Sequence, residues 1–208
     1  MKFKNNNDFI DLFEKRLKEY TGAKYVVLVS SCTNAIFLTL EYFKQYNVWP
    51  VQEVVIPNNT YVSVPKAILN AGFIPKFDKI KWKGSYQIGK LPLYDCAVGF
   101  VEKMYMSGTF QCLSFQQKKA LPIGKGGAIL LDNKDAYKIL KRMAHDGRNS
   151  SISTADDLEN IIPGYHMYMS PDEAAKGILL LNQYKPSKKD IGKYKEYPNI
   201  SKINYETK

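Results

Sequence analysis

The chain has 208 residues, 45% of them apolar, and its 30 lysines and arginines against 20 aspartates and glutamates give a formal net charge of +10. This size and apolar content predict a globular chain with one sizeable domain. The sequence contains no apolar stretch long enough to span a membrane, and the first residues, MKFKNNNDF, lack the apolar core of a signal peptide. We therefore expect a cytoplasmic protein with no membrane segment.

The excess of positive charge is spread along the chain and becomes dense only near the end, between Lys185 and Lys195. No DNA- or RNA-binding motif accompanies it, so we do not expect a nucleic-acid partner. A solvated basic surface that attracts anionic small molecules explains the charge equally well.

The cysteines and histidines argue against a metal site. Cys32, Cys96 and Cys112 are far apart, odd in number and not in a CxxC pair, which favours free thiols over a disulfide framework or a zinc cluster. The 2 histidines are too few for a multi-histidine metal site. We therefore predict no bound metal.

The chain opens with a helix pattern followed by a strand and a second helix. Asn6–Tyr20 places its apolar residues at helical spacing, and Tyr25–Val29 is an uninterrupted apolar run, typical of a strand buried on both faces in a parallel sheet. After the polar turn Ser30–Asn34, a helix is predicted over Ala35–Tyr46. Such a turn presents backbone N–H groups and hydroxyls to an anion, although capping by a serine or threonine explains it as well.

Two more strands are predicted over Glu53–Ile56 and Phe73–Phe77, with a helix between them that the residues 58–60 could cap. The stretch Ile80–Lys90 reads as polar and irregular. A further short strand, Leu91–Tyr94, stops at Asp95. A carboxylate at the carboxyl end of a strand lies where open α/β sheets bind ligands, but it could equally cap the next turn.

The stretch Gln111–Leu131, QCLSFQQKKALPIGKGGAILL, is the strongest candidate for a site. An apolar strand ends at Ser114, Lys118 and Lys119 follow, and a glycine-rich turn leads into a second apolar strand. Desolvation of a lysine between buried strands would lower its pKa and make the amine a nucleophile. Taken alone, this stretch is explained equally well as a basic hairpin loop.

The remaining sequence predicts a helix over Lys134–His145, a polar loop over Ser150–Asn160, and a helix over Ser170–Tyr184 that begins with a capping box. The alternation of strands and helices predicts the α/β class, with a mostly parallel sheet between helices in three αβα layers. We assign residues 1–184 to one domain and residues 185–208 to a basic, weakly ordered tail.

Five blocks in this order resemble the DegT/DnrJ/StrS-type sugar aminotransferases, a branch of the fold-type I enzymes that use pyridoxal 5'-phosphate (PLP). The blocks are VVLVSSCTNAIFLTL, EVVIPNNTYVSVPKAILNAGFIPKFD, LYDCAVGF, SFQQKKALPIGKGGAILLDN and GYHMYMSPDEAAKGILLLNQY. The resemblance implies the large, PLP-binding domain of that fold in a reduced form, with the family's small C-terminal domain absent.

The resemblance also implies roles for individual residues. Lys119 takes the position of the lysine that forms the Schiff base with PLP, and Asp95 that of the aspartate paired with the pyridine nitrogen. Tyr61 replaces the aromatic residue that stacks on the ring. The phosphate-binding positions of the family correspond to Cys32, Thr33 and Ser114.

His166 falls where the family has an asparagine that reaches the phosphate of the neighbouring subunit, which implies a homodimer with shared sites. In the family the amino donor is commonly glutamate and the acceptor is a nucleotide-linked keto sugar. The resemblance therefore implies a cytoplasmic PLP-dependent sugar aminotransferase.

The sequence departs from the family pattern at several polar positions. Cys32 replaces the glycine of the SGT motif, Val98 a glutamine or histidine, Lys125 the glutamate of GEGG, and Tyr168 an arginine. The segment between Asp78 and Asp95 is also shorter, by roughly one strand–helix unit. An alternative is therefore a catalytically weak or inactive protein of this family that binds PLP or a nucleotide sugar, or that associates with another protein.

Overall fold

The computed structural model describes residues 7–46, 48, 52–186, 191–203 and 205. Its α-helices are α1 (Asn7–Thr21), α2 (Cys32–Gln45), α3 (Ser63–Asn70), α4 (Lys134–Ala144), α5 (Thr154–Asp157) and α6 (Pro171–Gln183). Its strands are β1 (Tyr25–Val29), β2 (Glu53–Pro57), β3 (Ile74–Asp78), β4 (Tyr86–Gln87), β5 (Leu93–Asp95), β6 (Phe110–Ser114) and β7 (Gly127–Leu131). Two short 3-10 helices, η1 (Leu158–Asn160) and η3 (Tyr194–Glu196), complete the described elements.

The larger sheet has the strand order β1-β7-β6-β5-β4, and β2 and β3 form a separate parallel pair. Within the larger sheet β5 and β6 are parallel, whereas β1 and β7, β6 and β7, and β4 and β5 are antiparallel. The predicted α/β class is confirmed, but the prediction of a mostly parallel sheet is wrong, because the sheet is mixed. A strand buried on both faces has the same apolar pattern in either direction, so the pattern does not fix the pairing.

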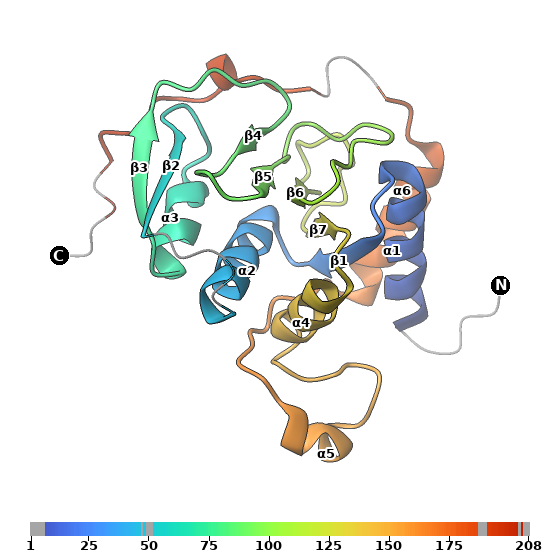
Figure 1. The fold of residues 1–208 in the computed structure, drawn as a ribbon. Coiled ribbons are helices and arrows are strands. Elements are labelled where there is room, and N and C mark those ends of the chain that lie inside the picture. The colour runs from blue at the N-terminus through green and yellow to red at the C-terminus, as the bar shows by residue number, and fades with distance from the viewer. Residues whose placement is uncertain (1–6, 47, 49–51, 187–190, 204, 206–208) are drawn as a thin grey trace.

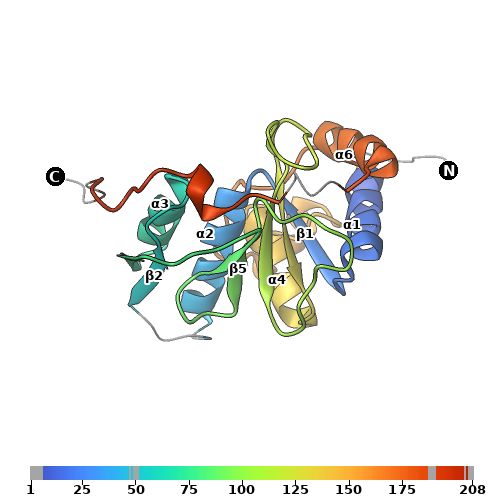
Figure 2. The same ribbon diagram turned by 90° about the horizontal axis from the view of Figure 1, so that it is seen from above.

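Helices cover both faces of the larger sheet and give the predicted three layers (Figures 1 and 2). Helices α1 and α6 pack on one face, and α2 and α4 on the other. Strand β1 serves both cores: Val26 and Leu28 belong to the cluster with α1, and Val27 and Val29 to the cluster with α2 and α4. This position between two cores explains why the sequence of β1 is apolar without interruption.

Two helices begin at different residues from those predicted. Helix α2 begins at Cys32, three residues before the predicted start, and the side chain of Ser31 caps it by accepting the Asn34 N–H at 3.1 Å. Helix α3 begins at Ser63 without a side-chain cap. The predicted caps at residues 58–60 are wrong, because this segment bonds to other parts of the chain; the Asn58 N–H, for example, donates to Asp78 O at 2.8 Å.

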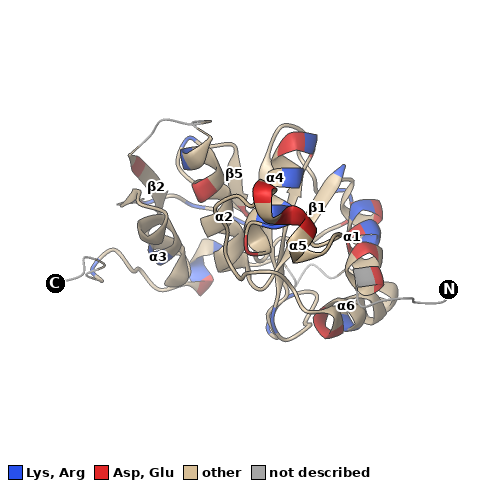
Figure 3. Cartoon of the chain, turned by 90° about the horizontal axis from the view of Figure 1, so that it is seen from below, with Lys and Arg blue, Asp and Glu red and all other residues tan. Residues whose placement is uncertain are grey.

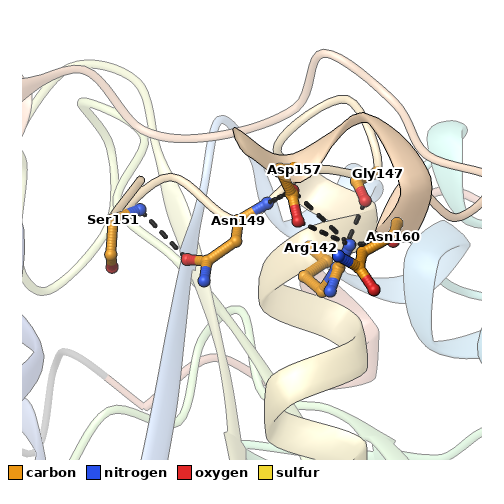
Figure 4. Close-up of polar contacts among 6 residues, drawn as sticks. All are labelled: Arg142, Gly147, Asn149, Ser151, Asp157 and Asn160. Carbon is orange, nitrogen blue, oxygen red and sulfur yellow. Dashed lines mark hydrogen bonds and ion pairs between the residues drawn. The ribbon is translucent and has the colours of Figure 1, made fainter. Parts of the chain in front are cut away.

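Two segments that the sequence predicts to be irregular contain secondary structure. The stretch 80–90 includes β4, and the stretch 150–160 forms α5 and η1. Figure 4 shows how Arg142 of α4 holds the second segment: its guanidinium lies 3.4 Å from the buried Asp157 carboxylate and donates to Asn160 O and Gly147 O. The Asn149 N–H also donates to Asp157, so this one carboxylate connects residue 149 to Arg142 of α4.

The C-terminal segment, residues 191–200, returns across the molecule to β2 and α3 (Figure 1). Its backbone bonds to two loops: Gly84 N–H donates to Gly192 O at 2.7 Å, and Ile200 N–H donates to Asn58 O at 2.9 Å. The side chain of Ile200 is buried. The expected weakly ordered tail, residues 185–208, also includes residues 187–190, 204 and 206–208, which lie outside the described residues, and the domain boundary at residue 184 stays a prediction.

No helix among the described residues is both long and apolar enough to cross a lipid bilayer. Charged residues of both signs lie along α1, and α5 is acidic (Figure 3). This mixture fits the diffuse charge distribution seen in the sequence.

Candidate active site

A pocket of about 630 Å³ opens where the carboxyl ends of β5 and β6 meet the start of α2. Six residues to which the sequence analysis gives site roles line it, namely Cys32, Thr33, Tyr61, Asp95, Ser114 and Lys119. They come from four distant parts of the sequence. The fold therefore brings together all but one of the predicted site residues.

The start of α2 lines one side of the pocket. Cys32 and Thr33 are its first residues, and the Thr33 hydroxyl lies 2.7 Å from the Ser63 hydroxyl. Glycine is required opposite this helix start, because a Cβ on Gly127 would lie 2.5 Å from the Ser31 carbonyl carbon. The close approach of β7 fixes the end of α2 that carries the positive pole of the helix dipole.

The loop between β6 and β7 carries the two lysines. Its turn is closed by the Lys119 N–H, which donates to Gln116 O at 2.9 Å, and by the Gly124 N–H, which donates to Phe115 O at 3.1 Å. Lys119 is half-buried, whereas Lys118 is exposed, although both line the pocket. The predicted burial therefore applies to Lys119 and not to the pair.

Asp95 is buried at the end of β5 and accepts hydrogen bonds on both carboxylate oxygens. The Ala97 N–H donates to Oδ1 at 2.9 Å, and the Tyr86 hydroxyl donates to Oδ2 at 2.8 Å. Burial raises the pKa of Asp95, and the Ala97 and Tyr86 hydrogen bonds and the charge of Lys119 oppose this rise. The charge of Lys119 thus acts on this carboxylate.

The three cysteines gather around Asp95. The Cys32 thiol lies 3.9 Å from Asp95 Oδ1, and Cys112 is the neighbour of Asp95 in the pairing of β5 with β6. All three thiols are free and buried, and burial raises the pKa of each. They are therefore held as neutral thiols, and only Cys32 lines the pocket.

A second side of the pocket consists of aromatic residues that the sequence analysis does not assign to the site. Trp82 and Tyr86 have ring centroids 5.2 Å apart, and Tyr197 of the C-terminal segment lies 5.4 Å from Trp82. All three line the pocket together with the exposed Tyr61. The sequences around these three residues show neither the strand nor the helix period of apolar residues. Their aromatic content is the one signal in the sequence that could have identified them as site residues.

His166 does not line this pocket. Its side chain is 73% exposed, and its Nδ1 lies 3.1 Å from the Asp146 carboxylate. His166 pairs with His145 in an isolated antiparallel β-bridge next to the end of α4. The structure therefore does not bring His166 together with the other predicted site residues.

Comparison with known proteins gives one curated relative and many similar folds. The spore coat polysaccharide biosynthesis protein SpsC of Bacillus subtilis (strain 168) is 26% identical over an alignment that covers 81% of this chain and 55% of SpsC. The structure of NtdA from Bacillus subtilis with bound cofactor PMP superposes with a TM-score of 0.66 at 21% identity, over 83% of this chain and 47% of NtdA. GDP-4-keto-6-deoxymannose-3-dehydratase (ColD), a mutant with bound GDP-perosamine, gives a TM-score of 0.63 at 16% identity, over 85% and 61%.

The chain spans 55% of the length of SpsC. The solved structures are 21% and 16% identical to it, and at this level of identity they show the fold alone. The profile of the DegT/DnrJ/EryC1/StrS aminotransferase family matches residues 2–88 and 97–189 and skips the short stretch that contains Asp95. Because this match extends over most of the sequence, the chain belongs to the DegT/DnrJ/EryC1/StrS aminotransferase family.

Proposed function

We propose that the pocket binds PLP and that the chain transfers an amino group from an amino acid, glutamate, to a nucleotide-linked keto sugar. One observation carries the proposal: Lys119 and Ser114 from one sequence block and Asp95 from another line one pocket. Burying the Asp95 carboxylate raises its pKa and costs stability, and groups perturbed in this way cluster at functional sites, which favours a functional explanation over a structural one.

The residues of the pocket fit the chemistry of PLP. Its volume of about 630 Å³ lies within the range of roughly 300 to 1,000 Å³ that is usual for small-molecule sites. The start of α2, at Cys32 and Thr33, suits a phosphate group because a helix N-terminus offers N–H groups and a positive dipole. The Ser114 hydroxyl adds a further hydrogen-bonding group on the same pocket wall.

Other residues of the same pocket suit the ring. Asp95 offers a carboxylate for a protonated pyridine nitrogen, and Lys119 offers an amine for the aldehyde. The exposed ring of Tyr61 is available for stacking against the cofactor. The residues present thus match the phosphate, the ring nitrogen, the ring face and the aldehyde.

When bound, PLP supplies an aldehyde carbon that takes up the amino group and a protonated ring that accepts electrons. Lys119 Nζ would be the amine that bonds to the aldehyde and, when free, the base that would move a proton at the α-carbon of the donor. Asp95 stabilises the positive charge on the ring nitrogen. The α2 start, with Thr33, holds the phosphate and so fixes the reacting carbon near Lys119.

The lysines at the mouth support an anionic substrate. Lys118 and Lys125 line the pocket beside Lys119, and Lys125 stands where the family has a glutamate. A cluster of positive charge attracts the carboxylates of glutamate and the diphosphate of a nucleotide-linked sugar. The GDP-perosamine bound to the related fold ColD is a nucleotide-linked sugar and supports this class of acceptor.

We also propose that the chain acts in the cytoplasm as a homodimer in which His166 of one subunit reaches the cofactor phosphate of the other. The exposed position of His166 outside its own pocket supports this role. Its hydrogen bond with Asp146 would hold the ring in place for a phosphate. Light scattering would test the dimer, and His166→Ala should weaken PLP binding without removing it.

A half-reaction tests the transfer. Protein loaded with PLP and mixed with glutamate should lose its visible absorption and release 2-oxoglutarate in a 1:1 ratio with bound cofactor. Lys119→Ala should abolish this conversion, whereas Lys138→Ala, which changes an exposed lysine on α4, should leave it intact. Binding of PLP without conversion by any amino donor would support a catalytically weak binding protein instead.

A further inference from the structure

Tyr86 lies beside Asp95 because of how β4 and β5 pair. The two residues are direct partners in this antiparallel ladder, so their side chains share one face of the sheet. The Tyr86 hydroxyl donates to Asp95 Oδ2 at 2.8 Å and lies 2.5 Å from the Thr60 hydroxyl. Since a tyrosine hydroxyl has one proton, the Thr60 hydroxyl is the donor in the second contact. The order of donation is therefore Thr60 to Tyr86 to Asp95.

The two oxygens of Asp95 differ in their surroundings. Oδ1 accepts the Ala97 N–H and lies 3.9 Å from the Cys32 thiol, whereas Oδ2 accepts from Tyr86 alone among the described residues. A carboxylate oxygen can accept about two hydrogen bonds. Oδ2 therefore keeps the capacity to accept one more donor, and both Asp95 and Tyr86 line the pocket.

We propose that Tyr86 is a positioning residue for Asp95: its hydroxyl, fixed by Thr60, orients Oδ2 and stabilises the ionised carboxylate that receives the ring nitrogen of PLP. The inference rests on the proposed function for its ligand. It assigns a role to β4, which lies in the shortened segment before Asp95, at the end of the first stretch that matches the family.

The charged and titratable groups around Asp95 come from every element packed on it. They are Tyr86 from β4, Cys96 after β5, Cys112 from β6, Cys32 from α2, Lys119 from the β6–β7 loop and Tyr197 from the C-terminal segment. Burial raises the pKa of Asp95, and the Tyr86 hydrogen bond is among the contacts that lower it again. Loss of the hydroxyl should therefore raise this pKa further.

Binding of pyridoxamine 5'-phosphate (PMP) gives the first test, because PMP has the same ring and no aldehyde to bond to Lys119. Tyr86→Phe should weaken PMP about tenfold, since a hydrogen bond to a charged group is lost. In an Asp95→Asn background the same change should weaken PMP less than about twofold, since there is no charge left to stabilise. Tyr137→Phe, which removes a hydroxyl that donates to the buried Glu14, is the matched control and should leave PMP affinity unchanged.

The ligand-free protein gives the second test. When folding raises the pKa of a carboxyl, the protein becomes less stable as the pH rises from the carboxyl's pKa in the unfolded state to its pKa in the folded state. Tyr86→Phe should raise the pKa of Asp95 in the folded state and so extend this pH range upward. The substitution should therefore cost more stability at pH 8 than at pH 5. In the Asp95→Asn background the cost should be equal at both pH values.

These two tests separate the inference from the proposed function. If wild-type protein binds PMP but Tyr86→Phe has equal effects with and without Asp95, Tyr86 has a structural role only and the inference is overturned. If wild-type protein fails to bind PMP while the pH-dependent coupling persists, the proposed function is overturned and the link between Tyr86 and Asp95 is supported.

Discussion

The two walls of the pocket are built in different ways. One, which we call the motif wall, consists of residues 31–33 and 114–127; the other, the added wall, consists of residues 82–86 and 191–200. The motif wall depends on particular residue types, such as Ser31, which caps α2, and Gly127, where a Cβ would clash with Ser31. The added wall depends on backbone hydrogen bonds between segments far apart in sequence, such as the one that the Tyr194 N–H donates to Trp82 O at 3.2 Å.

This difference decides what the sequence can reveal. A helix cap or a glycine at a close approach needs one residue type, and so it leaves a motif. A backbone hydrogen bond can be made by almost any residue, so the pairing of residues 82 and 194 leaves none. We expect single substitutions to damage the motif wall more than the added wall.

The largest effect is expected for Gly127→Ala in the motif wall. Its new Cβ would lie 2.5 Å from the Ser31 carbonyl carbon, and that backbone cannot move without shifting the start of α2. We expect a loss of about 2 to 3 kcal/mol in the free energy of unfolding, measured by urea denaturation, and weaker PLP binding.

Gly108→Ala is the control for Gly127→Ala, because a Cβ there meets nothing within 4 Å and only its φ of +77° opposes alanine. It should cost about 1 kcal/mol and leave PLP binding unchanged. Equal losses at the two glycines would show that close packing at the α2 start is not what the motif wall requires.

An intermediate effect is expected for Tyr197→Ala in the added wall. The ring is partly buried and packs on Trp82 with centroids 5.4 Å apart. Its removal should lower the free energy of unfolding by about 1 to 2 kcal/mol and weaken PLP, because the pocket loses one side. Tyr46→Ala, at the more exposed end of α2, should leave PLP affinity unchanged. Unchanged affinity in Tyr197→Ala would remove residues 191–200 from the site.

The smallest effect is expected for Asn59→Ala, which loosens the C-terminal segment. The Asn59 amide donates to Tyr197 O at 2.8 Å, so its loss should cost about 1 kcal/mol and raise hydrogen exchange in residues 191–200. Asn70→Ala, at the exposed end of α3, should change neither quantity. If Asn59 instead capped α3, as the sequence predicts, the increased exchange would appear in α3.

The sequence predicts those parts of the fold in which neighbouring residues determine the structure. The apolar run of β1 lies between two cores, and the capping box at Ser170 starts α6 as expected. The sequence does not predict strand direction, because β7 is buried and apolar in the same way whether it runs parallel or antiparallel to β1.

The candidate site divides along the same line. Asp95 ends β5 and Lys119 lies in the loop after β6, so pattern and family resemblance both point to them. Thr60 is predicted as a helix cap, yet it bonds to Tyr86, because the fold places β4 beside the loop after β2. Such long-range partners are decided by tertiary packing, which outweighs the local preference of threonine for a cap.

The most direct measurement of the central claim is the site of covalent attachment of PLP. Folded protein incubated with PLP and reduced with sodium borohydride should carry one cofactor, and peptide mass spectrometry should locate it on Lys119. A folded protein that takes up no cofactor, or a cofactor located on Lys118 or elsewhere, would contradict the account.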